Sequence, residues 1–179
     1  SSGLPLLEEA QRLLAENPPG DGLKITFKRV DLAAVDWSAG LTDRLFDGAV
    51  CFAALHHIPG ITYRQDLLKQ AAALIKPGGW FIHSVWQFQH SPKLMARVKP
   101  WELAGLRDSD VEEGDTLLDW RHQCDDQDKE PGLRYVHLFS REELGGLAQR
   151  AGFEIVDEFE SDGQGERLGL YQVWQKIIS

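Results

Sequence analysis

The stretch FDGAVCFAALHHIP, residues 46–59, decides the fold. Its first part is apolar almost throughout, without the alternation that a strand with one solvated face shows. Such a run is typical of a strand covered on both faces in a parallel sheet, so we expect it to be central. A helical stripe in RQDLLKQAAALIKPGG (64–79) follows, with KPGG as its stop and turn, and WFIHSVWQF (80–88) is the next predicted strand.

Helices and strands also alternate on either side of this unit. Residues 4–17 have the apolar spacing of an amphipathic helix, and LKITFKRVDL (23–32) predicts a strand that ends at Asp31. Ser140 and Glu143 form a capping box that opens a helix closed by Gly152, and two final strands (153–163 and 168–178) can form a hairpin. The order predicts an α/β fold with a mostly parallel sheet, helices on both faces and a C-terminal antiparallel pair.

The chain has the length of a single domain, residues 1–179. Residues 87–133 show no clean period, so we interpret them as an insertion or lid outside the sheet. In open α/β sheets the ligand binds outside the carboxyl ends of the strands. We therefore expect the functional residues to follow these strand ends or to lie in the lid.

Composition excludes several classes of protein. The net charge of −9 opposes non-specific attraction to a polyanion, and two cysteines are too few for a disulfide framework. No apolar run approaches the roughly 20 residues that span a bilayer, and the first residues lack the pattern of a signal peptide. We expect a cytoplasmic protein with no membrane partner.

The strand that ends at Asp31, the stretch 46–59, the helix 64–79 and the strand 80–88 resemble successive landmarks of class I S-adenosylmethionine-dependent methyltransferases. The resemblance implies a Rossmann-like fold and S-adenosylmethionine as cofactor. This chain lacks the glycine-rich loop and the first two strands of that family. We therefore expect the natural protein to continue upstream by about 30 or more residues, one βαβ half-unit.

A narrower resemblance is carried by FDGAVCFAALHHI, SVWQFQ and LRYVHLFSREELGGL. These stretches are similar to the tRNA wobble-uridine carboxymethyl methyltransferases, which implies a carboxylate on tRNA as the acceptor. A small-molecule acceptor is the alternative, and so is a non-catalytic partner subunit that has lost the glycine loop. A homo-oligomer or an activating partner also stays open, whereas a dinucleotide-dependent oxidoreductase would need a fingerprint that this sequence lacks.

The resemblance implies a cofactor site built from the ends of two strands. Asp31 would accept a hydrogen bond from the adenine amino group, with the Leu32 backbone beside it. Phe52, Ala53 and Leu55 would line the cofactor at the end of the central strand. The alternatives are a turn aspartate at position 31 and ordinary core packing for the other residues.

The acceptor would lie among polar residues near the double histidine and the lid. His56 and His57 are candidates to line the acceptor pocket, and they have no accompanying set of metal ligands. A carboxylate acceptor would be oriented by an arginine fork, for which Arg121 and Arg134 are candidates, with Tyr135 and His137 shaping the pocket. A surface ion pair is the alternative role for either arginine.

Overall fold

The computed structural model describes residues 4–20, 22–41, 44–120, 132–163 and 165–178. Contacts divide the chain into two units, Ser1–Trp37 and Ser38–Ser179, and each is described by itself. None of the described helices has the length and apolar character needed to cross a membrane.

The first unit contains helix α1, Leu4–Glu16, which confirms the predicted N-terminal helix. The prediction of a strand ending at Asp31 is wrong, because residues 23–31 form no strand. An isolated strand leaves its backbone groups unpaired, and among the described strands none pairs with this segment. Asp31 instead stabilises a turn, in which its Oδ1 accepts a hydrogen bond from the Ala33 amide at 3.0 Å.

The second unit is built on a four-stranded sheet in the order β1-β2-β7-β6. Its strands are β1 (Phe46–Phe52), β2 (Ile75–Trp86), β6 (Phe153–Ser161) and β7 (Gly169–Lys176). β1 and β2 are parallel, whereas β7 lies between β2 and β6 and is antiparallel to both. The predicted hairpin is confirmed, but the described sheet is mixed rather than mostly parallel because β7 is inserted in this way.

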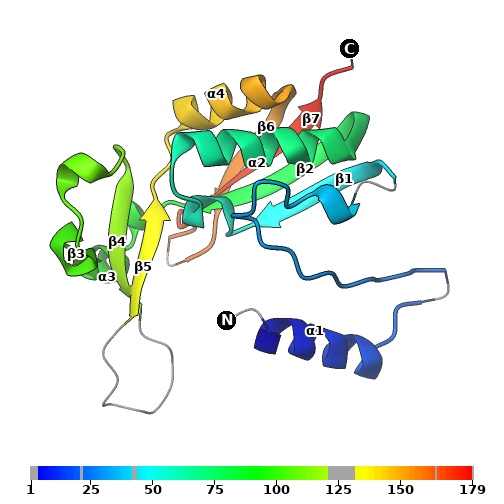
Figure 1. Cartoon of the computed structure of the whole chain (residues 1–179), viewed down its shortest axis with the longest axis horizontal. Helices are drawn as coiled ribbons and strands as arrows, with labels where there is room; N and C mark the ends of the chain where they lie inside the picture. The colour runs from blue at the N-terminus through cyan, green and yellow to red at the C-terminus, as the bar shows by residue number, and fades with distance from the viewer. Residues whose placement is uncertain (1–3, 21, 42–43, 121–131, 164, 179) are drawn as a thin grey trace. The chain divides into compact units, whose positions relative to one another are not determined.

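Helices α2 (Ile61–Leu74) and α4 (Arg141–Ala151) pack side by side on one face of the sheet (Figure 1). The helix α4 begins as predicted, with Ser140 Oγ accepting from the Glu143 amide, and it ends at Gly152 in the left-handed region. The side chains buried between helices and sheet are mostly aliphatic and aromatic, among them Leu67, Leu68, Phe81, Leu144, Leu147 and Trp174. Burial of these apolar surfaces is the main force that holds the unit together.

Strand β1 is an edge strand, which corrects the expectation that it is central and covered on both faces. Among the described strands it pairs only with β2. Val50 is 66% exposed and Phe52 is 53% exposed on the face opposite to the helices, where Phe159 is 48% exposed. The apolar composition of β1 was correctly interpreted as a strand, but composition does not reveal which neighbours are present.

The Lys76–Gly79 segment belongs to strand β2 and is not the turn that the sequence predicts. The pairing of β1 with β2 shifts register here, between Phe46 and Gly48, so the segment forms a bulge. Gly78 has a φ of 75°, and a Cβ on Gly79 would lie 2.6 Å from the Asp47 carbonyl oxygen. Both glycines are therefore needed for a strand that must bend close to its neighbour.

The predicted lid forms a second sheet in the order β3-β4-β5, beyond the end of β2 (Figure 1). It contains α3 (Pro92–Met95), β3 (Val98–Lys99), β4 (Asp115–Trp120) and β5 (Gly132–His137). A small core of Phe88, Leu118 and Val136 holds it. The described residues also contain short 3₁₀ segments: Ala39–Leu41, Leu55–His57, Phe88–His90, Trp101–Ala104 and Asp108–Asp110.

Candidate functional site

The carboxyl ends of β1 and β2 lie side by side. Phe52 pairs with Ser84, and the amide of Ala53 donates to the Ser84 carbonyl at 3.2 Å. Ala53 has a φ of 49°, an unusual value for a residue with a Cβ. Such strain tends to occur at binding and catalytic sites, and here it turns the chain sharply away from the strand.

The turn leads directly to His56 and His57, which lie in the 3₁₀ segment Leu55–His57. The His56 ring stacks on Trp86 at the end of β2, with ring centroids 4.9 Å apart, and its Nδ1 accepts from the Trp86 amide at 3.2 Å. His57 Nδ1 lies 3.0 Å from the backbone carbonyl of Tyr135 on β5. The double histidine therefore joins the main sheet to the lid.

Both imidazoles are held in the neutral form in this setting. Burial, followed by the charges of His57 and Arg134, lowers the pKa of His56 to about 3. The pKa of His57 is also lowered, mainly by burial and further by Arg134, although the bond to the Tyr135 carbonyl opposes the shift. Both rings are therefore neutral near pH 7, and Arg134 lies close enough to act on both electrostatically.

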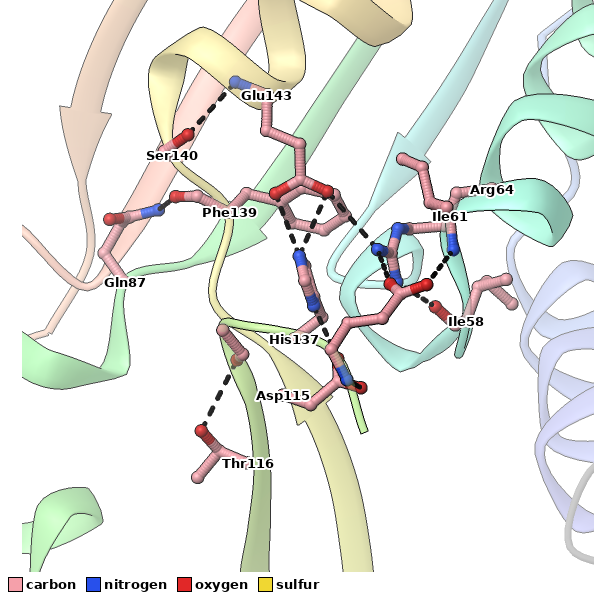
Figure 2. Close-up of polar contacts among 12 residues, drawn as sticks. Ile58, Ile61, Arg64, Gln87, Asp115, Thr116, His137, Phe139, Ser140 and Glu143 are labelled. Atoms are coloured by element: carbon pink, nitrogen blue, oxygen red, sulfur yellow. Dashed lines mark hydrogen bonds and ion pairs between the residues drawn. The ribbon is translucent and has the colours of Figure 1, made fainter. Parts of the chain in front are cut away.

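A buried polar network joins the lid to the helices (Figure 2). His137 lies between two carboxylates, with Nδ1 2.6 Å from Asp115 Oδ1 and Nε2 2.9 Å from Glu143 Oε2. Arg64 on α2, only 1% exposed, pairs with Glu112 at 2.6 Å and with Glu143 at 3.3 Å. Every link crosses between different elements, so the network fixes the lid against α2 and α4.

The charges in this network support one another. Burial disfavours the imidazolium of His137, but its hydrogen bonds to Glu143 and Asp115 outweigh that effect and raise its pKa. Burial likewise opposes ionisation of Asp115, and hydrogen bonds from Tyr135 and His137 overcome it and lower its pKa. Glu112, Asp115 and His137 bring potential metal-ligand atoms within 4.8 Å of one another, but these atoms already bind protein partners.

A pocket of about 840 Å³ lies beside this network, where β2 ends and α4 begins. Gln87 and Gln89, which follow β2, line one part of it, and Glu113, Glu142 and Glu143 line another. The volume is that of a small-molecule site, which is typically about 300–1,000 Å³. Arg141 lines the pocket too, so three glutamates against one arginine leave it with a net negative charge, which would repel a polyanion.

The structure brings some of the predicted residues together. Five of them lie close together in the chain at the end of β1: Phe52, Ala53, Leu55, His56 and His57. The positive charge of Arg134 lowers the pKa of both histidines. Phe52 is exposed, whereas Leu55 is 1% exposed and packs in the core. His137 and the side chain of Tyr135 belong to the network with Asp115.

The structure does not show where three other predicted residues lie relative to the end of β1: Asp31, Leu32 and Arg121. Asp31 and Leu32 lie in the first unit, so their approach to the end of β1 stays a prediction. Arg121 lies outside the described residues. A clamp formed by Arg121 and Arg134 therefore also stays a prediction.

These clusters also contain three residues that the sequence did not predict for them: Arg64, Asp115 and Trp86. Arg64 precedes Leu67 and Leu68 by three and four positions, and both are buried, so a charge on the buried stripe of α2 was the signal. Asp115 offered no signal, since an acidic residue in an acid-rich segment is ordinarily solvated. Trp86 was assigned to the strand, which is correct, but its ring contact with His56 depends on the turn after β1.

The fold and the polar groups at its strand ends define a Rossmann-like α/β domain of the kind found in methyltransferases. Residues 8–158 match the family model described as "Methyltransferase domain", and the chain belongs to this family. The chain matches no curated protein.

Solved structures share the fold at low sequence identity. An S-adenosylmethionine-dependent methyltransferase of Methanosarcina mazei is 20% identical with a TM-score of 0.67, over 97% of this chain and 78% of that one. A second, from Clostridium acetobutylicum, is 13% identical with a TM-score of 0.67, over 97% and 72%. The CcbJ methyltransferase of Streptomyces caelestis is 16% identical with a TM-score of 0.67, over 97% and 72%. These neighbours share the Rossmann-like fold that the sequence predicts.

Proposed function

We propose that the protein transfers a methyl group from S-adenosylmethionine to a small-molecule acceptor. The observation that carries the proposal is the strained turn at Ala53, which places an exposed aromatic ring and two histidines at the carboxyl end of β1 in a chain of the methyltransferase family. Ligands of open α/β sheets bind at this edge.

The described residues at this edge fit a nucleoside. Phe52 offers an uncovered ring at the tip of β1, and bases stack on such rings with about 1–3 kcal/mol each. Ala53 is small, so a ligand can approach the backbone there. Asp31 belongs to the first unit and has a second carboxylate oxygen beyond its turn bond; as the sequence resemblance implies, we propose that it accepts from the adenine amino group with the Leu32 backbone beside it. When bound, the cofactor supplies an electrophilic methyl group on a sulfonium.

A small acceptor fits this chain better than tRNA. The formal charge is −9, and the pocket after the end of β2 is lined by three glutamates against one arginine, Arg141. Among the structural neighbours, one is a 1,6-didemethyltoxoflavin N1-methyltransferase of Burkholderia thailandensis and another is the N-methyltransferase NodS of Bradyrhizobium japonicum, each crystallised with S-adenosylhomocysteine. The tRNA acceptor implied by the narrower resemblance gains no comparable support.

Titration calorimetry with S-adenosylhomocysteine tests the cofactor site. We expect binding that weakens about tenfold in Phe52→Ala, because the stacking surface is lost. Phe159→Ala is the matched control: Phe159 is 48% exposed on the same face, but it lies on β6 and should leave the affinity unchanged. In a second pair of variants, Asp31→Asn should weaken binding, whereas Asp36→Asn, at an exposed aspartate, is its control and should not. Absence of binding by the unmodified protein would favour a non-catalytic partner subunit.

A methyl-transfer assay tests the acceptor class. The protein is incubated with methyl-labelled S-adenosylmethionine and either undermodified tRNA or a panel of small amines, phenols and carboxylates. We expect label in the small-molecule fraction. Label in tRNA would overturn the small-molecule proposal while leaving the cofactor proposal intact.

A further inference from the structure

The backbone assigns opposite protonation to the two adjacent imidazoles. The amide of Trp86 can only donate, so His56 Nδ1 at 3.2 Å is the acceptor and its proton sits on Nε2. The carbonyl of Tyr135 can only accept, so His57 Nδ1 at 3.0 Å carries the proton. His57 Nε2 is therefore left with a lone pair.

The two Nε2 atoms also differ in their surroundings. His56 is fully buried, and its Nε2 has no hydrogen-bond partner among the described residues. His57 is only half-buried, and no hydrogen bond to its Nε2 is found among the described residues; since this atom is also absent from the buried atoms that lack a partner, it keeps some exposure to solvent. The lone pair of His57 is thus open to a ligand, whereas the Nε2–H of His56 is enclosed.

The groups around His57 keep it unprotonated. Its ring meets the edge of the His56 ring at 4.3 Å and that of Trp86 at 5.7 Å, and neither carries a charge near pH 7. Burial and the charge of Arg134 on β5 lower the pKa of His57, and the Tyr135 carbonyl only partly compensates. A neutral imidazole with an accessible Nε2 is the form that accepts a proton.

His57 also occupies the place where a reaction is expected. It lies five positions after Phe52, beyond the strained turn, at the edge where parallel β1 and β2 end together. Its Nδ1 is held by the backbone of β5, so the direction of the Nε2 lone pair is fixed by both the sheet and the lid. A general base is most effective when its lone pair is held in a fixed direction toward the proton that it accepts.

We propose that His57 Nε2 is the general base of the methyl transfer, and that the acceptor is therefore a protic group, an amine, ring N–H or hydroxyl. The inference rests on the proposed methyltransferase function and names its substrate class. The acceptor heteroatom forms a bond to the methyl carbon, the S–C electron pair stays on sulfur as a thioether, and the proton of the acceptor moves to His57 Nε2. Water then takes this proton from the imidazole.

A carboxylate acceptor would make such a base unnecessary. Carboxylic acids have a reference pKa of about 4, so they are already ionised at neutral pH. An N–H or O–H acceptor carries a proton that must be lost, and a positioned base accelerates this step by about 10²–10⁴-fold. The accessible lone pair of His57 Nε2 therefore favours an N–H or O–H acceptor over a carboxylate.

Nitrogen-15 NMR of the histidine-labelled protein tests the base without any acceptor. We expect the His57 ring to show a protonated Nδ1 and a bare Nε2 at pH 7, with a pKa below the ordinary 6.5. His57→Asn assigns the signal and retains a donor toward the Tyr135 carbonyl. A protonated Nε2, or a doubly protonated ring at pH 7, would overturn the proposal.

Methyl transfer to imidazole, aniline, phenol and benzoate gives the second readout. We expect N- or O-methyl products, a rate in His57→Asn reduced by about 100-fold or more, and loss of the acid limb of its pH profile. His90→Asn, at an exposed histidine, is the control. A methyl ester of benzoate as the main product, or full activity of His57→Asn, would overturn the proposal.

S-adenosylhomocysteine affinity separates this inference from the function on which it rests. Unchanged affinity in His57→Asn with reduced transfer supports the base. If the unmodified protein does not bind S-adenosylhomocysteine, the proposed function itself is wrong, whatever the NMR shows. If S-adenosylhomocysteine binds but none of the protic probes is methylated, the proposal of a general base for a protic acceptor is overturned while the cofactor proposal stands.

Discussion

His137 Nδ1 and Asp115 Oδ1 are 2.6 Å apart across paired positions of β5 and β4. Glu143 reaches the opposite nitrogen of the same ring from helix α4 (Figure 2). One imidazole thus links the two strands of the lid to a helix of the main unit, and its protonation should control how firmly they are joined.

The first prediction concerns the pH dependence of stability. The pKa of His137 is raised above its ordinary 6.5, so its stabilising contribution is complete below pH 6.5 and is lost as the pH rises through the higher folded value. Asp115 has a lowered pKa, so its contribution is present above the ordinary 3.8 and is lost as the pH falls below it. We therefore expect the interaction between Asp115 and His137 to stabilise the fold fully between pH 3.8 and pH 6.5.

His137→Gln isolates this contribution. Because the ring is buried with two charged partners, we expect the variant to lose about 1–3 kcal/mol of unfolding free energy at pH 6 and less at pH 9. Urea denaturation of both proteins at several pH values measures the difference. The exposed His90→Gln should show no such trend. If the difference in unfolding free energy between the two proteins grew with pH, it would contradict the raised pKa of His137.

A second prediction concerns Arg64, whose guanidinium is 1% exposed and contacts Glu112, Glu143 and the Ile58 carbonyl. Arg64→Met should cost about 3 kcal/mol, since two carboxylates lose their buried partner. The cost lies at the low end of the usual range because Glu112 is 40% exposed and solvent can screen its charge. Lys69→Met, on the exposed face of the same helix, should stay within about 0.5 kcal/mol. Equal stability of both variants in urea would contradict a structural role for Arg64.

The sequence predicted most elements because their patterns are local. The α1 and α4 helices, the strand character of β1, the C-terminal hairpin and the capping box at Ser140 all follow from spacing and capping within a few residues. The strand expected at residues 23–31 failed because a strand also needs a partner, which local composition does not supply.

The candidate site was predictable only in part, for the same reason. His56, His57 and Arg134 were identified from the motif, and the structure brings them within electrostatic reach of one another. The tautomers depend on two backbone groups, at Trp86 and Tyr135, that lie 30 and 78 positions away in the chain. Contacts over such separations come from the topology of the sheet and lid, and no short pattern encodes them.

The third prediction compares two glycines. A Cβ on Gly79 would lie 2.6 Å from the Asp47 carbonyl oxygen and 2.7 Å from Ile75 Cγ2, so Gly79→Ala should destabilise the fold by about 1–3 kcal/mol through overpacking. Gly145 lies inside α4 with nothing within 4 Å of the added atom, so Gly145→Ala should stabilise by about 0.5–1 kcal/mol. Thermal unfolding of the two variants should therefore shift in opposite directions. A shift in the same direction would contradict the close approach of β1 and β2 at the bulge.

The last prediction concerns Arg134, whose positive charge opposes protonation of both His56 and His57. Arg134→Gln removes the charge, so the pKa of His57 should rise toward 6.5, and the acid limb of the methyl-transfer profile should move to higher pH with it. The exposed Arg150→Gln should leave both unchanged. High salt should produce part of the same shift in the unmodified protein, because mobile ions screen a charge that lies near solvent. If Arg134 also clamps a carboxylate acceptor, its loss should in addition weaken acceptor binding, and a binding titration with the acceptor distinguishes this role from the electrostatic one.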